Sequence, residues 1–299
     1  MPLIVVGSTA YDSIHTPTGS RENCLGGSST YFSLAARFFS PVRLVSVVGE
    51  DFADQDLRML QGTGVDTAGL EVANGKTFRW TGKYHADMNH RDTLDLQLNT
   101  FGAFEPKVPA AWKDTPFLFL ANGHPNVQAS VLDQVPGARF VVADTMDFWI
   151  ETAEPELREL LQRIDGLILN DEEAKQLVDE HNLITAGAKL LELGPKLVVV
   201  KKGEHGCFLF SQFFQFALPA YPTENVLDPT GAGDSFAGGF MGYLSSAGRV
   251  SLGNLKKAMA YGTVTASLNV EAFGVDRLAE SQRDDVERRF EEFLQFVTF

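Results

Sequence analysis

The segment "VLDPTGAGDSFAGGFMGYL", from Val226 to Leu244, decides the fold and the chemistry expected of this chain. Pro229 fixes a turn, while Gly231 and Gly233 tolerate positive φ and let a ligand approach the backbone closely. From Asp234 onward, apolar residues recur at helical spacing, so the glycines lie at the start of a helix. Free N–H groups and the positive end of the helix dipole make such a start an anion site. Asp234 is then either a helix cap or a general base.

The helix that follows contains more glycine than a plain surface helix would. Gly238, Gly239 and Gly242 lie within it. Each weakens a helix by up to about 1 kcal/mol relative to alanine. These three residues therefore indicate close packing against another backbone or against a ligand.

Two common phosphate-binding motifs are missing from the sequence. There is no GxxxxGK[ST] segment, which excludes a P-loop. "GAGDSF" lacks the third glycine of GxGxxG, and no such motif follows the first apolar run. A Rossmann-type oxidoreductase is therefore disfavoured.

Short apolar runs that end in glycine, asparagine or aspartate recur along the chain. They are "PLIVVGS", "VRLVSVVGED", "PFLFLANG", "ARFVVADT", "DGLILND" and "KLVVVKKG". Such runs predict strands of a parallel sheet covered on both faces. Helical patterns such as "TYFSLAARFF" and "EPELRELLQRI" lie between them. This alternation predicts an α/β fold in one large domain, which suits 299 residues with 44% hydrophobic content.

Residues 75–102 break this alternation. The segment is polar and aromatic, and Phe78, Trp80 and Gly82 alternate with polar positions. Period-two spacing predicts antiparallel hairpin strands outside the main sheet. Residues 11–25 are similarly irregular, so we expect a small β appendage built from both segments.

The composition limits the partners of the protein. A net charge of −14 disfavours non-specific binding of nucleic acid. No apolar run approaches the roughly 20 residues of a membrane helix, so no membrane partner is expected. Cys24 and Cys207 form no CxxC pair and no disulfide framework. This predicts reduced thiols and a cytoplasmic protein.

The segment "DPTGAGDSFAGGFM" resembles the C-terminal signature of the PfkB (ribokinase-like) carbohydrate kinases. It fits the pattern D-[PT]-x-G-A-G-D-x-F-x-x-G at every position, and the order of the other motifs extends the resemblance over essentially the whole chain. The resemblance implies a three-layer α/β/α sandwich with a mostly parallel central sheet. It also implies a single domain over residues 1–299, with a small β lid formed by about 11–25 and 75–102.

The same resemblance implies roles for the glycine turn. Asp234 would be the catalytic base that takes a proton from a substrate hydroxyl, which then attacks the γ-phosphate of ATP. Gly231, Ala232 and Gly233 would direct backbone N–H groups at the transferring phosphoryl group. Because a carboxylate at a positive helix end is stabilised in its charged form, we expect a low pKa for Asp234.

Substrate-binding positions are implied near the N-terminus. Asp12 would accept hydrogen bonds from substrate hydroxyls, unless it only caps a turn. Gly26 and Gly27 resemble the diglycine of the family, which hinges the lid and lets the backbone touch the substrate. Tyr31 stands where the family usually has asparagine, which argues against ribose or fructose as the substrate.

Nucleotide and metal positions are implied further along the chain. Asn170 and Glu173 resemble the N-x-x-E element that organises Mg²⁺ through water, although an acid-rich helix start would look the same. Asp228 and Thr230 resemble positions that bind a monovalent cation such as K⁺ in some members. The expected nucleotide contacts are Asn170, Lys201, Lys202, Gly203, Gly206, Thr263, Asn269 and Gly274.

The sequence therefore predicts an ATP-dependent kinase that phosphorylates a hydroxyl of a sugar or nucleoside-like molecule. An adenosine-like nucleoside kinase and a non-catalytic nucleotide-binding protein are the alternatives. Trp80 and Tyr84 lie in the expected lid, where they could stack on a substrate ring. Asn122, Asp144 and Asp147 follow strands and are further candidates for the cleft. Because Phe78 and Trp80 would leave an apolar sheet face uncovered, we also expect a homodimer formed through the lid.

Overall fold

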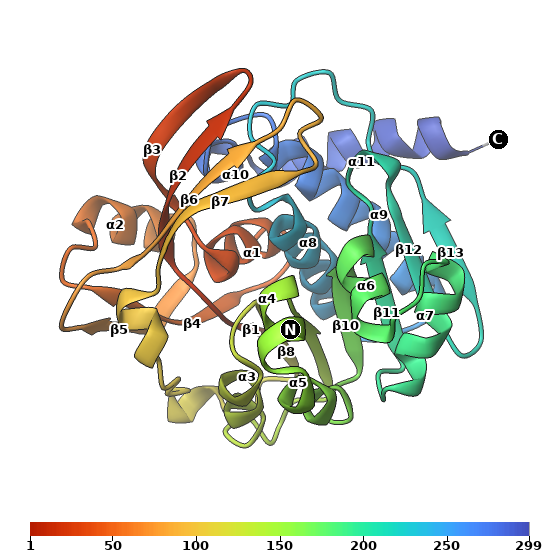
Figure 1. Cartoon of the computed structure of the whole chain (residues 1–299), viewed down its shortest axis with the longest axis horizontal. Helices are drawn as coiled ribbons and strands as arrows, with labels where there is room; N and C mark the ends of the chain where they lie inside the picture. Colours follow the sequence, from red (N-terminus) through yellow and green to blue (C-terminus); the bar gives the residue numbers. More distant parts are fainter. Residues whose placement is uncertain (299) are drawn as a thin grey trace.

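The computed structural model describes residues 1–298, which contain a nine-stranded sheet as their central layer (Figure 1). Neighbouring strands from β11 to β5 run parallel, whereas β12 and β13 are added antiparallel at one edge. The predicted mostly parallel sheet is thus confirmed. In sheet order the strands are β13 (Gln215–Leu218), β12 (Cys207–Ser211), β11 (Leu197–Lys201), β10 (Gly166–Asn170), β9 (Phe140–Asp144), β8 (Phe117–Leu120), β1 (Leu3–Val6), β4 (Val42–Gly49) and β5 (Asp66–Ala73).

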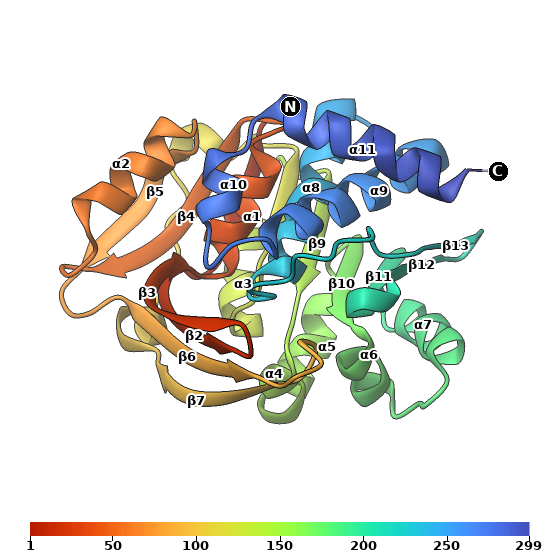
Figure 2. The same ribbon diagram turned by 90° about the horizontal axis from the view of Figure 1, so that it is seen from above.

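Helices cover both faces of this sheet, because successive side chains of its strands point to opposite sides. Leu3 and Val5 of β1 pack into one apolar core, and Ile4 and Val6 pack into the other. The first core is covered by α1 (Ser28–Ala36), α2 (Asp54–Gly62), α8 (Ala232–Ala247), α9 (Leu252–Asn269), α10 (Asp276–Glu280) and α11 (Arg283–Val297). The second is covered by α3 (Pro125–Leu132), α4 (Asp147–Thr152), α5 (Glu154–Leu161), α6 (Asp171–Val178) and α7 (Leu183–Glu192). Figure 2 shows the two layers from above. Three short 3₁₀ turns join these elements: η1 (Asn99–Ala103), η2 (Ala110–Trp112) and η3 (Gly203–His205).

A second sheet of four strands lies outside the central layer, and we call it the lid. Its order is β3 (Gly19–Gly26), β2 (Ala10–Thr16), β6 (Phe78–Tyr84) and β7 (Arg91–Gln97). The two outer pairs are antiparallel hairpins, as the alternation predicted, but the central pair β2–β6 is parallel. This parallel pairing joins two hairpins from separate parts of the chain. Figures 1 and 2 both show the four strands side by side.

The glycines of α8 lie against neighbouring helices. A Cβ on Gly238 would overlap the carbonyl oxygen of Phe32, and a Cβ on Gly242 would lie 2.9 Å from the backbone of Ala36. On the other side, a Cβ on Gly239 would collide with Thr265 of α9. We expected these glycines to pack against another backbone or against a ligand. The structure shows that they pack against the backbones of neighbouring helices. This contact holds α8 tightly between α1 and α9.

Among residues 1–298, no helix has the combination of length and apolar character that would let it cross a membrane.

Candidate active site

The predicted glycine turn lies at the N-terminus of α8. Gly231 is the N-cap residue, with φ of 73°, and no side chain in residues 1–298 caps this end of the helix. The Ala232 N–H donates to the Pro229 carbonyl (3.2 Å). It is therefore engaged in the turn, whereas the next amides, those of Gly233 and Asp234, lack an intrahelical acceptor because of their position. The structure thus provides an open helix end with an acid in its first turn.

Asp234 does not have the low pKa that its helix position predicts. Its pKa is raised to about 7, chiefly by burial and also by the nearby charge of Asp144, although Lys201 and Arg91 oppose the shift. The helix dipole stabilises the carboxylate only modestly, so desolvation outweighs it. The expectation of a low pKa was therefore wrong. A carboxyl with a pKa near neutrality is well matched to proton transfer.

Asp12 faces the same region from β2. Its side chain is 4% exposed, and its Oδ2 accepts a hydrogen bond from the Tyr31 hydroxyl (3.4 Å). The pKa of Asp12 is raised to about 7, chiefly by burial and also by the charges of Asp228 and Asp234. Asp12 therefore lies close enough to Asp234 for the two carboxyls to influence each other.

Three predicted glycines surround this carboxyl and the ring of Tyr31. A Cβ on Gly26 would overlap Oδ2 of Asp12, and a Cβ on Gly231 would overlap the Tyr31 ring. Gly27 is the N-cap residue of α1, with φ of 92°. Tyr31 is 1% exposed and fills the space between Asp12 and the glycine turn. It is thus a buried link between the two sides of the site.

A second group of charges lies at the ends of β9, β10 and β11. Lys201 Nζ is 3.5 Å from Asp144 Oδ2, and a Cβ on Gly233 would lie 2.8 Å from the same nitrogen. Burial lowers the pKa of Lys201, but Asp144, Glu173 and Asp234 together hold it above its ordinary value. The ammonium group therefore stays charged directly beneath the glycine turn.

Asn170 and Glu173 form a reciprocal capping box at the start of α6. The Asn170 N–H donates to Glu173 Oε2, and the Glu173 N–H donates to Asn170 Oδ1, both at 2.8 Å. Glu173 is buried, which raises its pKa to about 7, and Asp144 adds to the shift. The capping box engages Oε2 and leaves Oε1 for a water of a hydrated cation, so the pair fits a water-mediated Mg²⁺ site.

The other predicted nucleotide residues are more dispersed. Gly203 and Gly206 both have positive φ, in the turn between β11 and β12. Lys202 Nζ lies 5.4 Å from the centroid of the Phe208 ring. Thr263 is buried and donates to the Met259 carbonyl within α9. Gly203 and Gly206 therefore adopt backbone conformations that favour glycine, while Thr263 is engaged inside its own helix.

The candidate cation-binding residues Asp228 and Thr230 each take part in several hydrogen bonds within the protein. The two Asp228 oxygens accept the N–H groups of Thr230 (2.8 Å) and Gly274 (2.9 Å). The Thr230 carbonyl accepts from Asn269 Nδ2 (2.7 Å), and the Thr230 hydroxyl donates to Tyr84 (3.1 Å). Asn269 Oδ1 is buried without a hydrogen-bond partner in residues 1–298. Each of the Asp228 oxygens and the Thr230 carbonyl accepts one N–H bond and retains a lone pair, so the monovalent cation site at Asp228 and Thr230 stays a prediction.

The lid contributes an inner face to the site. Trp80 pairs with Asp12 across β2–β6, and Tyr84 pairs with Arg91 across β6–β7. Since paired residues share a face of a sheet, all four side chains lie on the side that reaches Thr230. Arg91 was not among the predicted residues, because an arginine in a polar hairpin has no motif around it. The pairing of Arg91 with Tyr84 in the β6–β7 hairpin is the observation that identifies it as a candidate site residue.

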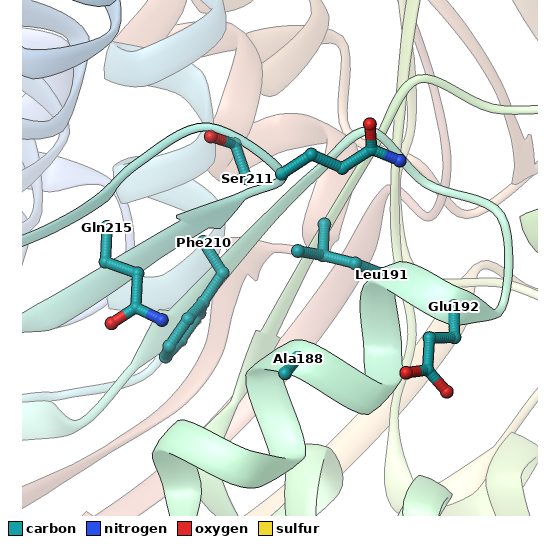
Figure 3. Close-up of a pocket in the computed structure, with 7 residues that line it drawn as sticks. Ala188, Leu191, Glu192, Phe210, Ser211 and Gln215 are labelled. Carbon is teal, nitrogen blue, oxygen red and sulfur yellow. The ribbon is translucent and has the colours of Figure 1, made fainter.

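Several candidates lie outside this group of residues. Asn122 accepts from the Trp149 indole N–H (3.0 Å), and Asp147 accepts from the Phe148 N–H. Both therefore have local structural partners. A surface hollow shown in Figure 3 lies between α7 and β12, where Leu191 and Phe210 line it. None of the predicted site residues lines this hollow.

Comparison with known proteins decides the family. A family model described as "pfkB family carbohydrate kinase" matches residues 3–282. The chain belongs to the pfkB family of carbohydrate kinases. As a pfkB kinase it is a phosphotransferase whose acceptor is an alcohol group. This confirms the resemblance carried by the segment around Asp234.

Relatives of this pfkB kinase include a cytidine kinase from Thermococcus kodakarensis, which is 30% identical over 247 residues and covers 81% of this chain and 87% of that protein. Among solved structures, a protein described as a ribokinase II from E. coli, in complex with ATP and Mg²⁺, has a TM-score of 0.80 at 22% identity, covering 97% of this chain and 99% of the other. A nucleoside kinase from Burkholderia thailandensis in complex with inosine has a TM-score of 0.80 at 19% identity, covering 98% and 99%. These likenesses confirm the predicted ribokinase-like fold.

Proposed function

We propose that this pfkB kinase transfers the γ-phosphate of ATP to a hydroxyl of a sugar or nucleoside, with Asp234 as the base. The observation that carries the proposal is the open N-terminus of α8 with Asp234 in its first turn. The acceptor oxygen attacks the γ-phosphorus and gives its proton to Asp234. The bond between the γ-phosphorus and the β,γ-bridging oxygen breaks, and its electron pair leaves with ADP. The Gly233 amide and the neighbouring turn stabilise the charge on the transferring group.

Asp12, Lys201 and Glu173 support this transfer in different ways. Asp12 orients the acceptor by accepting hydrogen bonds from its hydroxyls. Lys201 supplies positive charge beneath the glycine turn, at the Gly233 contact described above. Asn170 and Glu173 would hold the waters of Mg²⁺, which neutralises phosphate charge when it is bound.

A screen for ADP release over sugars, nucleosides and polyols tests this function. We expect turnover with at least one acceptor in the presence of ATP and Mg²⁺. Repeating the screen with and without K⁺ tests the predicted monovalent cation site at Asp228 and Thr230. Absence of ADP release with every acceptor, with and without K⁺, would contradict the proposal.

A nucleoside is the more specific candidate substrate, and Trp80 favours it. The indole lies over Gly82, where a Cβ would overlap the ring, and its N–H donates to Thr93 Oγ1 (3.2 Å). The ring is only partly buried and stands across the strand pair from Asp12. A fixed aromatic plane beside a hydroxyl-binding carboxyl suits a molecule that carries both a base and a ribose.

Replacing Trp80 with alanine tests this candidate. Base–aromatic stacking contributes about 1–3 kcal/mol, so we expect the KM for a nucleoside to rise about 5- to 150-fold. The KM for ATP should not change. An unchanged nucleoside KM in Trp80→Ala would contradict a stacking role for Trp80.

A homodimer formed through the lid is also proposed. Phe78 stacks on Phe101 (ring centroids 5.6 Å), and Trp80 faces the site, so neither forms the apolar outer face that we expected. Leu94 of the lid is 56% exposed and supports the proposal instead. Light scattering at increasing protein concentration checks it, and a persistent monomer would contradict it.

A further inference from the structure

Arg91 is a lid cation directed at the place where phosphoryl transfer is proposed. It is the first residue of β7 and pairs with Tyr84 of β6. Side chains of an antiparallel pair lie on the same face of the sheet. The Tyr84 hydroxyl accepts a hydrogen bond from Thr230, the residue before Gly231. The face that carries Arg91 is therefore the one that meets the glycine turn.

The tip of the β6–β7 hairpin, beside Arg91, contacts two segments where nucleotide-binding residues are expected: the turn after β11 and the start of α6. Asn89 Nδ2 donates to Glu204 Oε1 (3.3 Å) in the turn after β11. His90 Nε2 lies 3.6 Å from Glu172 Oε1, next to Glu173. Arg91 is thus held between two contacts, one to the glycine turn through Tyr84 and one to α6 through His90.

The guanidinium group faces acids that it does not touch. Its charge is among those that lower the pKa of both Asp234 and Glu173. Even so, it forms no ion pair within 4.0 Å of any acid in residues 1–298. The guanidinium therefore has no carboxylate partner there and keeps its donors for an anion. A phosphoryl group also matches the planar, bidentate donors of arginine.

We propose that Arg91 contacts the transferring phosphoryl group when both substrates are bound, and that it is a catalytic residue of this kinase. The proposal rests on the function proposed above. In the transition state the guanidinium donates to oxygens of the γ-phosphoryl group while the bond to the acceptor oxygen forms. The proton still goes to Asp234, and the electron pair of the broken bond still leaves with ADP. Because Arg91 belongs to the lid, this stabilisation is complete only when the lid covers the site.

Substitution of Arg91 gives the first test. In Arg91→Ala we expect kcat to fall about 10²- to 10³-fold, as for other groups that stabilise transferred charge. Arg91→Lys should lie between this variant and the parent protein, because lysine keeps the charge but not the planar fork. Lys83→Ala is the matched control. Lys83 neighbours Tyr84 in β6, so its exposed cation lies on the opposite face of the lid, and its loss should leave kcat unchanged.

Binding of a phosphoryl-transfer analogue gives a second test that does not depend on turnover. The affinity for Mg·ADP is compared with the affinity for Mg·ADP and aluminium fluoride together, in the presence of the acceptor. Arg91→Ala should keep the first affinity and lose most of the gain that aluminium fluoride produces. An equal gain in Arg91→Ala and the parent protein, or an unchanged kcat, would overturn the role of Arg91. A parent protein inactive with every acceptor would instead count against the proposed function.

Discussion

Replacing Asp234 with asparagine is expected to lower kcat by about 10²- to 10⁴-fold, the usual contribution of a positioned general base. The amide keeps the shape of the side chain but cannot accept the proton of the acceptor hydroxyl. Because burial raises the pKa of Asp234 to about 7, the parent enzyme should gain activity as the pH rises through 7 and the base ionises. Steady-state ADP release from pH 5.5 to 8.5 measures both effects.

Binding and stability separate this loss of chemistry from a loss of folding. The affinity for Mg·ATP should persist in Asp234→Asn. The folded-state pKa of Asp234 lies above its ordinary value, so the group favours folding only while protonated, and this contribution is lost as the pH rises through about 7. The neutral amide should therefore not lower Tm at pH 8. Asp54→Asn is the control, since Asp54 is an exposed acid in the first turn of α2. Near-normal kcat in Asp234→Asn would remove it as the base.

Replacing Gly238 with alanine is expected to lower the free energy of unfolding by about 2 kcal/mol. A Cβ at this position overlaps the Phe32 carbonyl and lies 2.8 Å from the Ala35 Cβ. Overpacking of this kind costs about 1–3 kcal/mol, and here the obstacle is backbone that cannot rotate away. Chemical denaturation followed by circular dichroism measures the change.

Gly62→Ala provides the matched control for this substitution. Gly62 is the last residue of α2, and a Cβ there meets nothing within 4 Å. Alanine should therefore stabilise this helix by up to about 1 kcal/mol through its higher propensity. If Gly238→Ala proved as stable as Gly62→Ala, close contact of α1 and α8 would not be the reason for the glycine.

Features with a local cause were predictable from the sequence. Continuous apolar runs such as "KLVVVKKG" predicted buried parallel strands, and β11 lies within that run. The edge strand β5 was missed, since its sequence "DTAGLEVA" mixes polar and apolar residues and it is largely solvent-accessible. The glycine turn at Gly231 was predicted because a helix start needs no distant partner to be recognised.

Features set by distant residues were not predictable in the same way. The pKa of Asp234 depends on burial and on Asp144 and Lys201, which come from β9 and β11. The link between Tyr31 and Asp12 likewise depends on α1 meeting the lid strand β2. The order of residues in the sequence does not show that either set of side chains comes together. The direction of the Arg91 side chain could be inferred only from the pairing register of β6 and β7.

The parallel pairing of β2 with β6 has a consequence for protein engineering. The lid is made from two stretches of chain, and β4, α2 and β5 lie between them in the sequence. A lid taken from a relative therefore cannot be transplanted as one continuous cassette. Exchange of residues 75–102 alone would set a foreign strand β6 against the native β2, whose Asp12 is proposed to bind the acceptor. Any redesign of acceptor choice by loop exchange has to replace both stretches together.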